Sequence, residues 1–406
     1  MHLLYLSSLL PKRSETFVYR EVLGLRDLGV RVSVASLYAP ERQLGDPRLD
    51  ALADEVITVY PAGLGRLLAD ATAFGAAHPM RAAGVKFRAI QDAVTAKDVS
   101  PAGRPKIFVQ ALAGLALAHR LRDRGITHLH VHLAHAPATV GMYAAQALDV
   151  PFSFTGHAAD LFRDRALLLP KLERAAFVAC ISEWNREWYQ SLVPRDPNDY
   201  PVIRCGVGVP ANPTARIPDG KFRMLALGRL VPKKGFDLLP SAVSKLRAAG
   251  VPVHCVVAGD GPERIRLEAT VADNGTAGDF EFLGDVCNGD VPGLIAGADV
   301  MVLPCRVDAS GDRDGIPVVL MEAMAQGLCV VGGDLPTIRE LIQSGQSGFL
   351  IGQTEMGKLA SVLEDLYRNP EKRLAAGLEG RRRVMDEFSS ATNLARLREA
   401  FQKKAS

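Results

Sequence analysis

Two carboxylates eight residues apart, Asp314 and Glu322, carry the clearest chemical signal in the sequence. Every residue of 318–325 except Glu322 is apolar, and the stretch predicts a helix that starts at Pro317. A helix that is apolar on all sides is buried, so Glu322 needs hydrogen-bond donors there. The loop that enters the helix holds Asp314 and Gly315, and a helix start favours an anion such as phosphate. This predicts a site for a ligand with hydroxyl and phosphate groups; the alternative is a core helix whose Glu322 has a protein partner.

A second candidate site lies in the loop 228–235, which follows an apolar strand and opens a helix. Arg229 offers a fixed charge and Lys234 a point charge at a helix N-terminus, and together they suit a diphosphate. The alternative is two solvated bases at the end of a strand. The nearby stretch 259–264 lacks the third glycine of the Gly-x-Gly-x-x-Gly pattern, because position 264 is Arg, so no nicotinamide cofactor is predicted.

Histidines form the third group of candidates. His157 follows an apolar strand directly after Gly156, where it could hydrogen-bond a substrate hydroxyl or assist proton transfer, or have a structural role. His128, His130 and His132 alternate and so share one face of a strand. We expect them to pack or to line a cleft, and we predict no metal site, because a metal would need a tighter cluster with acids.

These residues must be positioned by two α/β series, which predict two parallel sheets. The expected strands of the first series are 2–6, 30–37, 56–60, 128–133, 152–155 and 177–181. Helices are expected between them near 15–28, 63–95, 104–124, 137–148, 166–174 and 183–191. Those of the second are 222–227, 253–258, 280–283, 300–303, 329–331 and 349–351. We expect two doubly wound domains that face a central cleft, with ligands beyond the carboxyl ends of the strands. The predicted domains are 1–200 and 201–385, joined by the proline-rich stretch 194–220, and a C-terminal helix over 386–406 that returns to the first domain.

Composition agrees with this architecture. The 406 residues exceed one ordinary core, and 48% hydrophobic with 23% charged residues is typical of a globular protein. The six cysteines form no Cys-x-x-Cys pair and indicate buried thiols in a reducing compartment. The apolar start, residues 1–10, lacks the basic leader of a signal peptide, and no run of about 18 apolar residues exists. We therefore expect a cytoplasmic protein, and no nucleic-acid partner.

As a set, these loops resemble those of the retaining glycosyltransferases with the GT-B fold in the glycosyltransferase group-1 family (family GT4). The resemblance rests on Gly228-Arg229 with Lys234-Gly235, 259–262, 282–284, 298–300, 314–322, 154–157 and 180–182. Asp314 and Glu322 match the family's pair of acids with seven residues between them, although the first is usually Glu. Residues 14–17 are similar to an exopolysaccharide branch, comparable to colanic-acid enzymes.

The resemblance implies a role for each candidate. Glu322 is expected to bind the ribose hydroxyls of the donor, and the loop from Gly284 to Val286 its base. The donor sugar is expected to contact His157, Asp314 and the backbone of Gly315, Ile316 and Pro317. Arg229 and Lys234 are expected to stabilise the leaving diphosphate. The first loop lacks the paired glycines of the family, so Ser14 and Thr16 are expected to meet the diphosphate or the acceptor.

The activity that the resemblance implies is retaining transfer of a sugar from a UDP- or GDP-linked donor to a carbohydrate or lipid-linked acceptor, without metal or cofactor, in polysaccharide or glycolipid biosynthesis. Two alternatives stay open: a nucleotide-sugar epimerase on the same fold, and a non-catalytic nucleotide-binding partner of a polysaccharide complex. Product analysis separates the three. A glycosidase is not predicted, because no acid–nucleophile pair is evident.

Residues 81–124 hold nine Lys or Arg against three Asp, a net charge of +6. Apolar residues alternate with these bases: Val85, Phe87 and Ile90 lie near Lys86 and Arg88, and Ile107, Phe108 and Leu112 follow Lys106. Such a helix could lie on an anionic membrane, which would place the protein peripherally on the inner face. The alternative is a packed helix pair with a solvated basic face.

Overall fold

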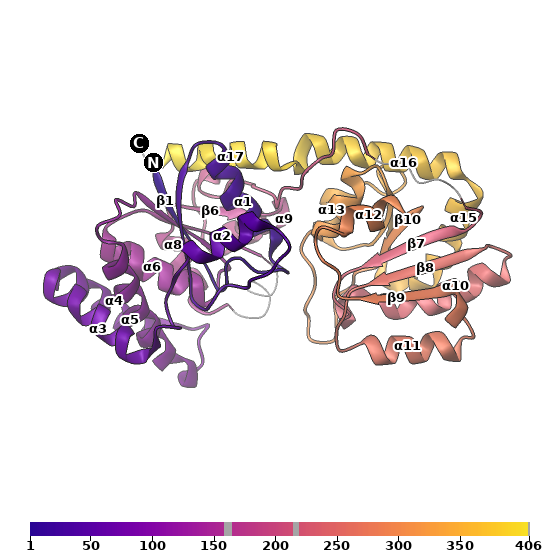
Figure 1. Ribbon diagram of the computed structural model, residues 1–406. Helices are drawn as coiled ribbons and strands as arrows, with labels where there is room; N and C mark the ends of the chain where they lie inside the picture. The colour runs from indigo at the N-terminus through magenta and orange to yellow at the C-terminus, as the bar shows by residue number, and fades with distance from the viewer. Residues whose placement is uncertain (158–164, 214–218, 405–406) are drawn as a thin grey trace. The chain divides into compact units, whose positions relative to one another are not determined.

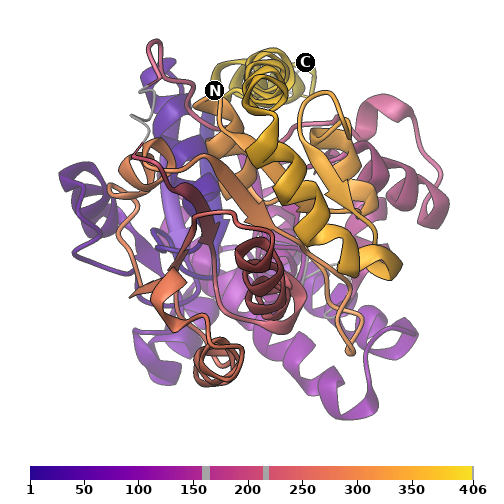
Figure 2. The same ribbon diagram turned by 90° about the vertical axis from the view of Figure 1, so that its right-hand side faces the viewer.

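Two six-stranded sheets organise the computed structural model, which describes residues 1–157, 165–213 and 219–404 (Figures 1 and 2). Strand pairs within both sheets are parallel, and helices flank each sheet. The chain forms two compact units: unit 1 is Met1–Arg204 with Leu394–Ser406, and unit 2 is Cys205–Asn393. The predicted doubly wound α/β architecture is confirmed.

Unit 1 has the strand order β3-β2-β1-β4-β5-β6. Its strands are β1 (His2–Ser7), β2 (Arg31–Ser36), β3 (Ile57–Thr58), β4 (His128–His132), β5 (Phe152–Gly156) and β6 (Phe177–Cys180). Its helices include α1 (Thr16–Asp27), α2 (Pro47–Glu55), α3 (Gly63–Ala77), α4 (Pro79–Thr95), α5 (Arg104–Leu121), α6 (Ala136–Leu148), α8 (Leu168–Arg174) and α9 (Glu183–Leu192).

Unit 2 has the strand order β12-β11-β10-β7-β8-β9. Its strands are β7 (Phe222–Leu227), β8 (Val253–Ala258), β9 (Phe280–Gly284), β10 (Val300–Leu303), β11 (Cys329–Gly333) and β12 (Phe349–Ile351). The helices that follow residue 205 are α10 (Leu239–Ala248), α11 (Arg264–Asp273), α12 (Val291–Ala296), α13 (Val318–Ala325), α14 (Pro336–Leu341), α15 (Leu359–Arg368), α16 (Pro370–Arg383) and α17 (Ser390–Lys403).

Each expected strand corresponds to an observed one, while two helical predictions were wrong. The expected helix over 63–95 is two helices, α3 and α4, because a residue before proline is driven out of the helical region. His78 has φ −137° and ψ 64°, and Pro79 starts α4. Helix α2 was missed, although Asp46 caps it through a hydrogen bond to the N–H of Arg48 and Pro47 follows at the first helical position.

The two faces of the unit 1 sheet are filled by alternate residues of β1. Leu4 and Leu6 belong to the core beneath α3 to α6, whereas Leu3 and Tyr5 belong to a core that also contains α1 and the end of α17. In that second core Phe401 is fully buried. The end of α17 therefore contributes to the core of unit 1.

Two histidines of β4, His128 and His130, pack against this second core. Phe401 meets the ring of His128 edge-on at 5.0 Å and that of His130 at 5.4 Å between centroids. Burial lowers the pKa of His128 to about 4 and, together with the neighbouring rings, lowers that of His130 well below its ordinary value. Both side chains are consequently neutral in the folded protein at neutral pH.

This burial predicts that unit 1 loses stability in weak acid. Between pH 6.5 and about 4 the unfolded chain protonates His128 and the folded chain does not, so stability falls as pH falls, by about 3 kcal/mol for this residue. Both tryptophans, Trp184 and Trp188, lie on α9, so urea unfolding followed by their fluorescence reports unit 1. We expect a flatter pH profile for His128→Asn. The control His254→Asn, in unit 2, should keep the profile of the parent, and a pH-independent parent would contradict the prediction.

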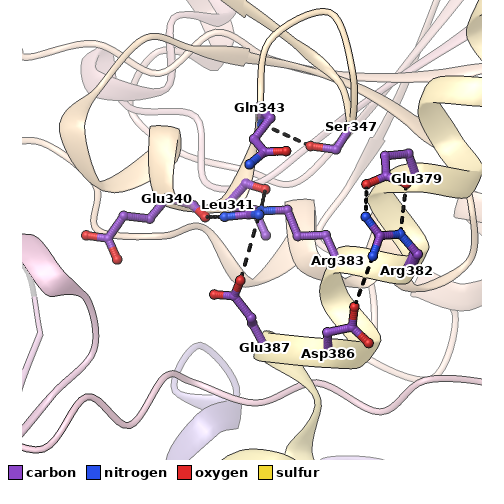
Figure 3. Close-up of polar contacts among 9 residues, drawn as sticks. All are labelled: Glu340, Leu341, Gln343, Ser347, Glu379, Arg382, Arg383, Asp386 and Glu387. Carbon is purple, nitrogen blue, oxygen red and sulfur yellow. Dashed lines mark hydrogen bonds and ion pairs between the residues drawn. The ribbon is translucent and has the colours of Figure 1, made fainter.

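In unit 2 helix α16 is tied to the rest of the unit by arginines (Figure 3). Arg383 donates from Nε to the carbonyl of Leu341 at 2.9 Å and from Nη2 to that of Glu340 at 2.6 Å. These carbonyls close α14, where the last turn of a helix lacks intrahelical donors. Arg382 pairs along its own helix with Glu379 and Asp386, which are exposed contacts of small energetic weight.

Among the described residues, no helix combines the length and the apolar character that crossing a membrane requires.

Candidate functional site

The strand order of unit 2 reverses between β7 and β10, which are neighbours in the sheet. From β7 the chain continues to β8 on one side, and from β10 to β11 on the other. Such a switch point is where doubly wound proteins bind their ligands, beyond the carboxyl ends of the strands. The two loops that start there are 228–238 and 304–317, and they contain Arg229, Lys234 and the residues from Asp314 to Pro317.

Glycines bring these two loops into backbone contact. Gly235 has φ +72°, and a Cβ atom on it would lie 2.2 Å from the carbonyl oxygen of Pro304. Any other residue would clash, so only glycine permits this approach. The approach places the side chain of Lys234 against that of Asp314.

Asp314 is the centre of a charged group that we call the Asp314 cluster: Lys233, Lys234, Cys305, Asp312 and Asp314. Lys234 Nζ lies 2.7 Å from Asp314 Oδ2, and Lys233 Nζ lies 3.3 Å from Oδ1 and 3.1 Å from Asp312 Oδ2. Cys305 donates from Sγ to Asp314 Oδ2 at 3.2 Å. The sequence predicted Lys234 and Asp314 as separate ligands; their direct pairing, and the part of Lys233, Cys305 and Asp312, are new.

Protonation of the cluster follows from these contacts. Burial raises the pKa of Asp314, but the charges of Lys234 and Lys233 outweigh it, so the carboxyl pKa lies below its ordinary value. Burial lowers the pKa of Lys234, but Asp314 reverses this and the pKa of the ammonium lies above its ordinary value. Burial and the Asp314 charge raise the pKa of the Cys305 thiol well above its usual range. At neutral pH the Lys234 ammonium thus faces the Asp314 carboxylate beside a neutral thiol.

Arg229 differs from these paired lysines. Its side chain is exposed, and neither a hydrogen bond nor an ion pair of its guanidinium occurs within 1–157, 165–213 and 219–404. Since the charges within the Asp314 cluster balance, Arg229 supplies the excess positive charge at this switch point. A planar, permanently charged donor of this kind suits a phosphate group.

Glu322 lies on α13, but the prediction that this helix is buried on all sides was wrong. Val318, Val319 and Glu322 are half-exposed, whereas Leu320, Met321 and the residues 323–325 are buried. The half-exposed residues lie three and four positions apart and form one stripe. Glu322 therefore lies on the partly accessible stripe of an otherwise buried helix.

Both ends of α13 suit such a site. The helix begins at Val318, one residue later than predicted, because Pro317 is its N-cap and has extended backbone angles. No side chain caps this end, which leaves it available to an anion. At the other end Arg381 donates to the carbonyl of Ala325, and α16 holds the helix in place. The loop before it is supported by Thr337, whose hydroxyl donates to the carbonyl of Asp314 at 3.3 Å.

The predicted base-binding loop follows β9. Gly284 is buried, has φ +70°, and accepts a hydrogen bond from the N–H of Gly259 at 2.7 Å. Val286 is half-buried and packs against the core of unit 2. The structure thus places an ordered turn with one apolar side chain here, at the edge of the sheet.

The residues predicted in unit 1 also lie at a reversal of strand order, between β1 and β4. Ser14 is exposed and Thr16 is the first residue of α1, in the loop that follows β1. His157 follows β5 and lies 3.1 Å from His132 at the end of β4, measured between Nε2 and Nδ1. The ring of Phe17 covers His157 at 4.2 Å between centroids.

One group of potential metal ligands occurs among the described residues: Glu21, His130 and His132, whose ligand atoms lie within 4.8 Å of one another. The expectation that these histidines have no acid beside them was therefore wrong. Glu21 comes from α1, far away in the sequence. Each ring nitrogen already has a protein partner: Ser153 and Thr155 for His130, and His157 and Glu21 for His132. The geometry is that of a hydrogen-bonded network.

A family model described as "Glycosyl transferases group 1" matches residues 212–383. The Anabaena protein Alr3699/HepE, solved in complex with UDP, superposes with a TM-score of 0.71 at 18% identity over 99% of this chain and all of its own. This likeness confirms the predicted GT-B fold.

Relatives in sequence agree with the family model. A GDP-mannose-dependent alpha-(1-6)-phosphatidylinositol monomannoside mannosyltransferase of Mycolicibacterium smegmatis is 31% identical over 47% of this chain and 54% of its own. A putative colanic acid biosynthesis glycosyltransferase, WcaL of Salmonella typhimurium, is 31% identical over 48% of each chain. The chain spans about half the length of these two. A phosphatidyl-myo-inositol mannosyltransferase of Mycobacterium leprae is 30% identical over 65% of this chain and 71% of its own. The chain belongs to the group-1 glycosyltransferases.

Proposed function

We propose that the protein transfers a sugar from a nucleoside-diphosphate donor to a carbohydrate or lipid-linked acceptor, with retention at the anomeric carbon. The observation that carries this proposal is the pairing of Lys234 with Asp314 at the switch point of unit 2. Exposed Arg229 belongs to the same two loops, and half-exposed Glu322 to the helix that directly follows them. Positive groups, an uncapped helix start and carboxylates are thereby gathered within two adjoining loops and one helix. A ligand that combines phosphates with sugar hydroxyls matches all of them.

The charge balance of the Asp314 cluster suggests how it acts. An ammonium has three N–H donors, so Lys234 can keep its bond to Asp314 and still donate to phosphate oxygens. Arg229 adds the net positive charge that stabilises the departing diphosphate, which is the principal electrostatic demand of the reaction. The bond from the anomeric carbon to the phosphate breaks, a bond to the acceptor oxygen forms on the same face, and the acceptor proton passes to the leaving phosphate.

The remaining site residues receive their roles from this arrangement. Asp314 and the backbone of Gly315 to Pro317 bind the sugar, and Glu322 binds the ribose hydroxyls. The turn from Gly284 to Val286 receives the base. The UDP complex of the Anabaena protein supports a UDP-linked donor, and the GDP-mannose-dependent relatives support a GDP-linked donor. Both kinds of donor are therefore candidates.

A screen of UDP- and GDP-linked sugars by thermal shift tests the proposal, because a ligand that binds the folded state raises its melting temperature. The donor that stabilises the protein is then supplied with candidate acceptors, and the products are analysed. Transfer with retained anomeric configuration is expected. Epimerised donor without acceptor would favour the isomerase, and binding without turnover would favour the non-catalytic partner.

We propose that the transfer needs neither a metal ion nor a cofactor. The support is that Arg229, Lys234 and the start of α13 supply positive charge where the diphosphate would leave. Excess chelator is expected to leave the rate unchanged within experimental error. Loss of activity in chelator that Mg²⁺ or Mn²⁺ restores would contradict this prediction.

The outer face of α4 supports contact with an anionic membrane. Met80, Phe87, Ile90 and Val94 are 84%, 69%, 52% and 68% exposed. At 3.6 residues per turn they fall within roughly 80° of the helix circumference. Arg81, Lys86 and Arg88 flank this stripe, so apolar side chains could enter a bilayer while the bases reach headgroups. Val85 and Ile107, included in the predicted stripe, are buried and belong to the core instead.

We expect the protein to sediment with anionic liposomes and not with neutral ones. High salt should release it, because headgroup attraction is screened over about 10 Å at 0.1 M. Binding should be lost when Lys86, Arg88, Lys97, Arg104 and Lys106 are replaced by Gln, and also in Phe87→Ser with Ile90→Ser. The charge-matched control replaces Lys245, Arg247, Lys358, Arg368 and Lys372 in unit 2 and should still bind. Equal sedimentation with anionic and neutral liposomes, or with neither, would contradict membrane binding. The outer face of α4 would then be a solvent-exposed surface.

A further inference from the structure

Lys233 contacts both ends of one loop segment, residues 306–314. Its backbone carbonyl accepts a hydrogen bond from the N–H of Arg306 at 2.9 Å. Its side-chain Nζ lies 3.3 Å from Asp314 Oδ1 and 3.1 Å from Asp312 Oδ2. The backbone and the side chain of this one residue therefore join the first residue of the segment to the last.

Arg306 strengthens the attachment at the first end. Its Nε donates to the carbonyl of Pro232 at 3.1 Å, and its Nη2 lies 2.8 Å from Asp237 Oδ1. Both partners belong to the loop that carries Lys233, so a backbone hydrogen bond, a side-chain hydrogen bond and an ion pair fix this end. Lys233 connects the fixed end to the other end of the segment, where Asp314 lies.

The residues between these ends form a tight turn with hydrogen bonds of its own. Asp308 Oδ1 accepts from the N–H of Ser310 at 2.8 Å and from that of Asp312 at 3.0 Å. The N–H of Asp308 donates to the carbonyl of Asp312 at 2.9 Å. The turn thus sets the position of Asp312, which gives the side chain of Lys233 a second acidic partner two residues before Asp314.

The carboxyl group of Asp314 has a different lysine at each oxygen. Oδ1 lies 3.3 Å from Lys233 Nζ, while Oδ2 lies 2.7 Å from Lys234 Nζ and 3.2 Å from Cys305 Sγ. The side chains of Lys233 and Asp314 are 16% and 13% exposed, so water competes little for these contacts. Because both oxygens are held, the plane of the carboxyl group is fixed, and with it the place of Lys234.

We infer that Lys233 is a positioning residue of the donor site, which closes the segment 306–314 and holds the Asp314 carboxyl group in the plane that meets Lys234. Asp312 acts through Lys233, as the second partner of its side chain. Lys234 and Asp314 are the residues that meet the donor, and this part rests on the proposed function. The closure of the segment does not, because it is a property of the fold that is measurable without any donor.

Hydrogen exchange of the full chain tests the closure first. We expect Lys233→Met, which keeps the length of the side chain and removes its nitrogen, to speed exchange of the backbone N–H groups of 306–314. Asp312→Asn is the milder variant and should have the same effect to a smaller degree. The control Lys245→Met removes an exposed lysine on α10 and should leave this exchange unchanged. Circular dichroism shows which variants are folded. Unchanged exchange of the segment in folded variants of Lys233 and Asp312 would overturn the inference.

The carboxyl group of Asp314 gives a second measurement. Burial raises its pKa, and the charges of Lys234 and Lys233 lower it below the ordinary value. The other titratable or charged groups that act on these three residues are Cys305, Asp312 and Arg229. Loss of Lys233 should therefore raise the pKa of Asp314, measured from carboxyl ¹³C signals of aspartate-labelled protein and assigned with Asp314→Asn. The control variant should keep the pKa of the parent, and a pKa that stays unchanged in Lys233→Met would contradict the role of Lys233.

The kinetic effect is measured once a donor is known. We expect kcat/KM at neutral pH to fall about 10- to 100-fold in Lys233→Met, the scale for a small misplacement of a reacting group. The acid limb of its pH profile should move to higher pH with the pKa of Asp314. A merely structural defect would lower the rate at every pH and leave the limb in place, which would overturn the inference.

The double variant Lys233→Met with Asp312→Asn isolates the part of Asp312. It should be no slower than Lys233→Met alone, because Asp312 acts through Lys233. Losses that multiply would show that Asp312 acts on its own and would refute its assigned role. Failure to find a donor would contradict the proposed function and not the closure of the segment, which the exchange and the titration decide.

Discussion

Glu322→Ala is expected to abolish sugar transfer and to weaken donor binding by about 10- to 100-fold, the range for losing a hydrogen bond to a charged group of about 1.5–3 kcal/mol. The reason is the position of Glu322 on the partly accessible stripe of α13, the helix that begins directly after the loop of Asp314. The fold should survive, because Ala is the best helix former and the side chain removed is half-exposed. Calorimetry with the donor and a product assay measure both effects.

Glu364→Ala is the control for this variant. Glu364 is likewise half-exposed on a helix of unit 2, but its partner is the neighbouring Arg368, an exposed pair of small energetic weight. It should leave affinity and rate unchanged. If a folded Glu322→Ala protein kept the donor affinity and the transfer rate of the parent, Glu322 would not be part of the donor site.

The sequence predicted the sheets well because their signal is local. Apolar runs of four to eight residues, separated by helical patterns, mark each strand without any knowledge of distant contacts. Loop residues at the carboxyl ends of the strands could be named for the same reason, and Arg229, Lys234 and Asp314 do lie in such loops. The helix break at Pro79 has a local signal too, because a proline disfavours the helical region in the residue before it.

The contacts within the site could not be predicted, because they join residues far apart in the chain. Nothing near Glu21 in α1 indicates that it meets His132, more than a hundred residues away. In the sequence Lys233 has no acidic neighbour and resembles a solvated surface base. In the structure the loop after β10 places Asp312 and Asp314 beside it. Glu322 was misplaced for another reason: composition alone cannot show which stripe of an apolar helix the tertiary fold leaves uncovered.

The pairing of Lys234 with Asp314 leads to the second large effect. Lys234→Ala is expected to lower kcat by about 10²-fold or more, the scale for removing one group that stabilises developing charge. Asp314→Asn should cost a similar factor, because it removes the negative charge that holds the ammonium and replaces one of the two acceptor oxygens with an N–H donor. Since the two groups are 2.7 Å apart and act as one unit, their losses should not multiply.

The double variant Lys234→Ala with Asp314→Asn is therefore expected to be about as slow as the slower single variant, measured as initial rates at saturating donor. Lys245→Ala, an exposed lysine on α10, is the control for loss of a positive charge and should keep the parent rate. Fully multiplicative losses would show that the lysine and the carboxylate act on separate parts of the donor. Single variants with the kcat of the parent would show that the diphosphate does not bind at this switch point. Arg229→Ala then gives the contribution of an exposed base outside the Asp314 cluster, and it should reduce kcat while leaving the Lys234–Asp314 coupling intact.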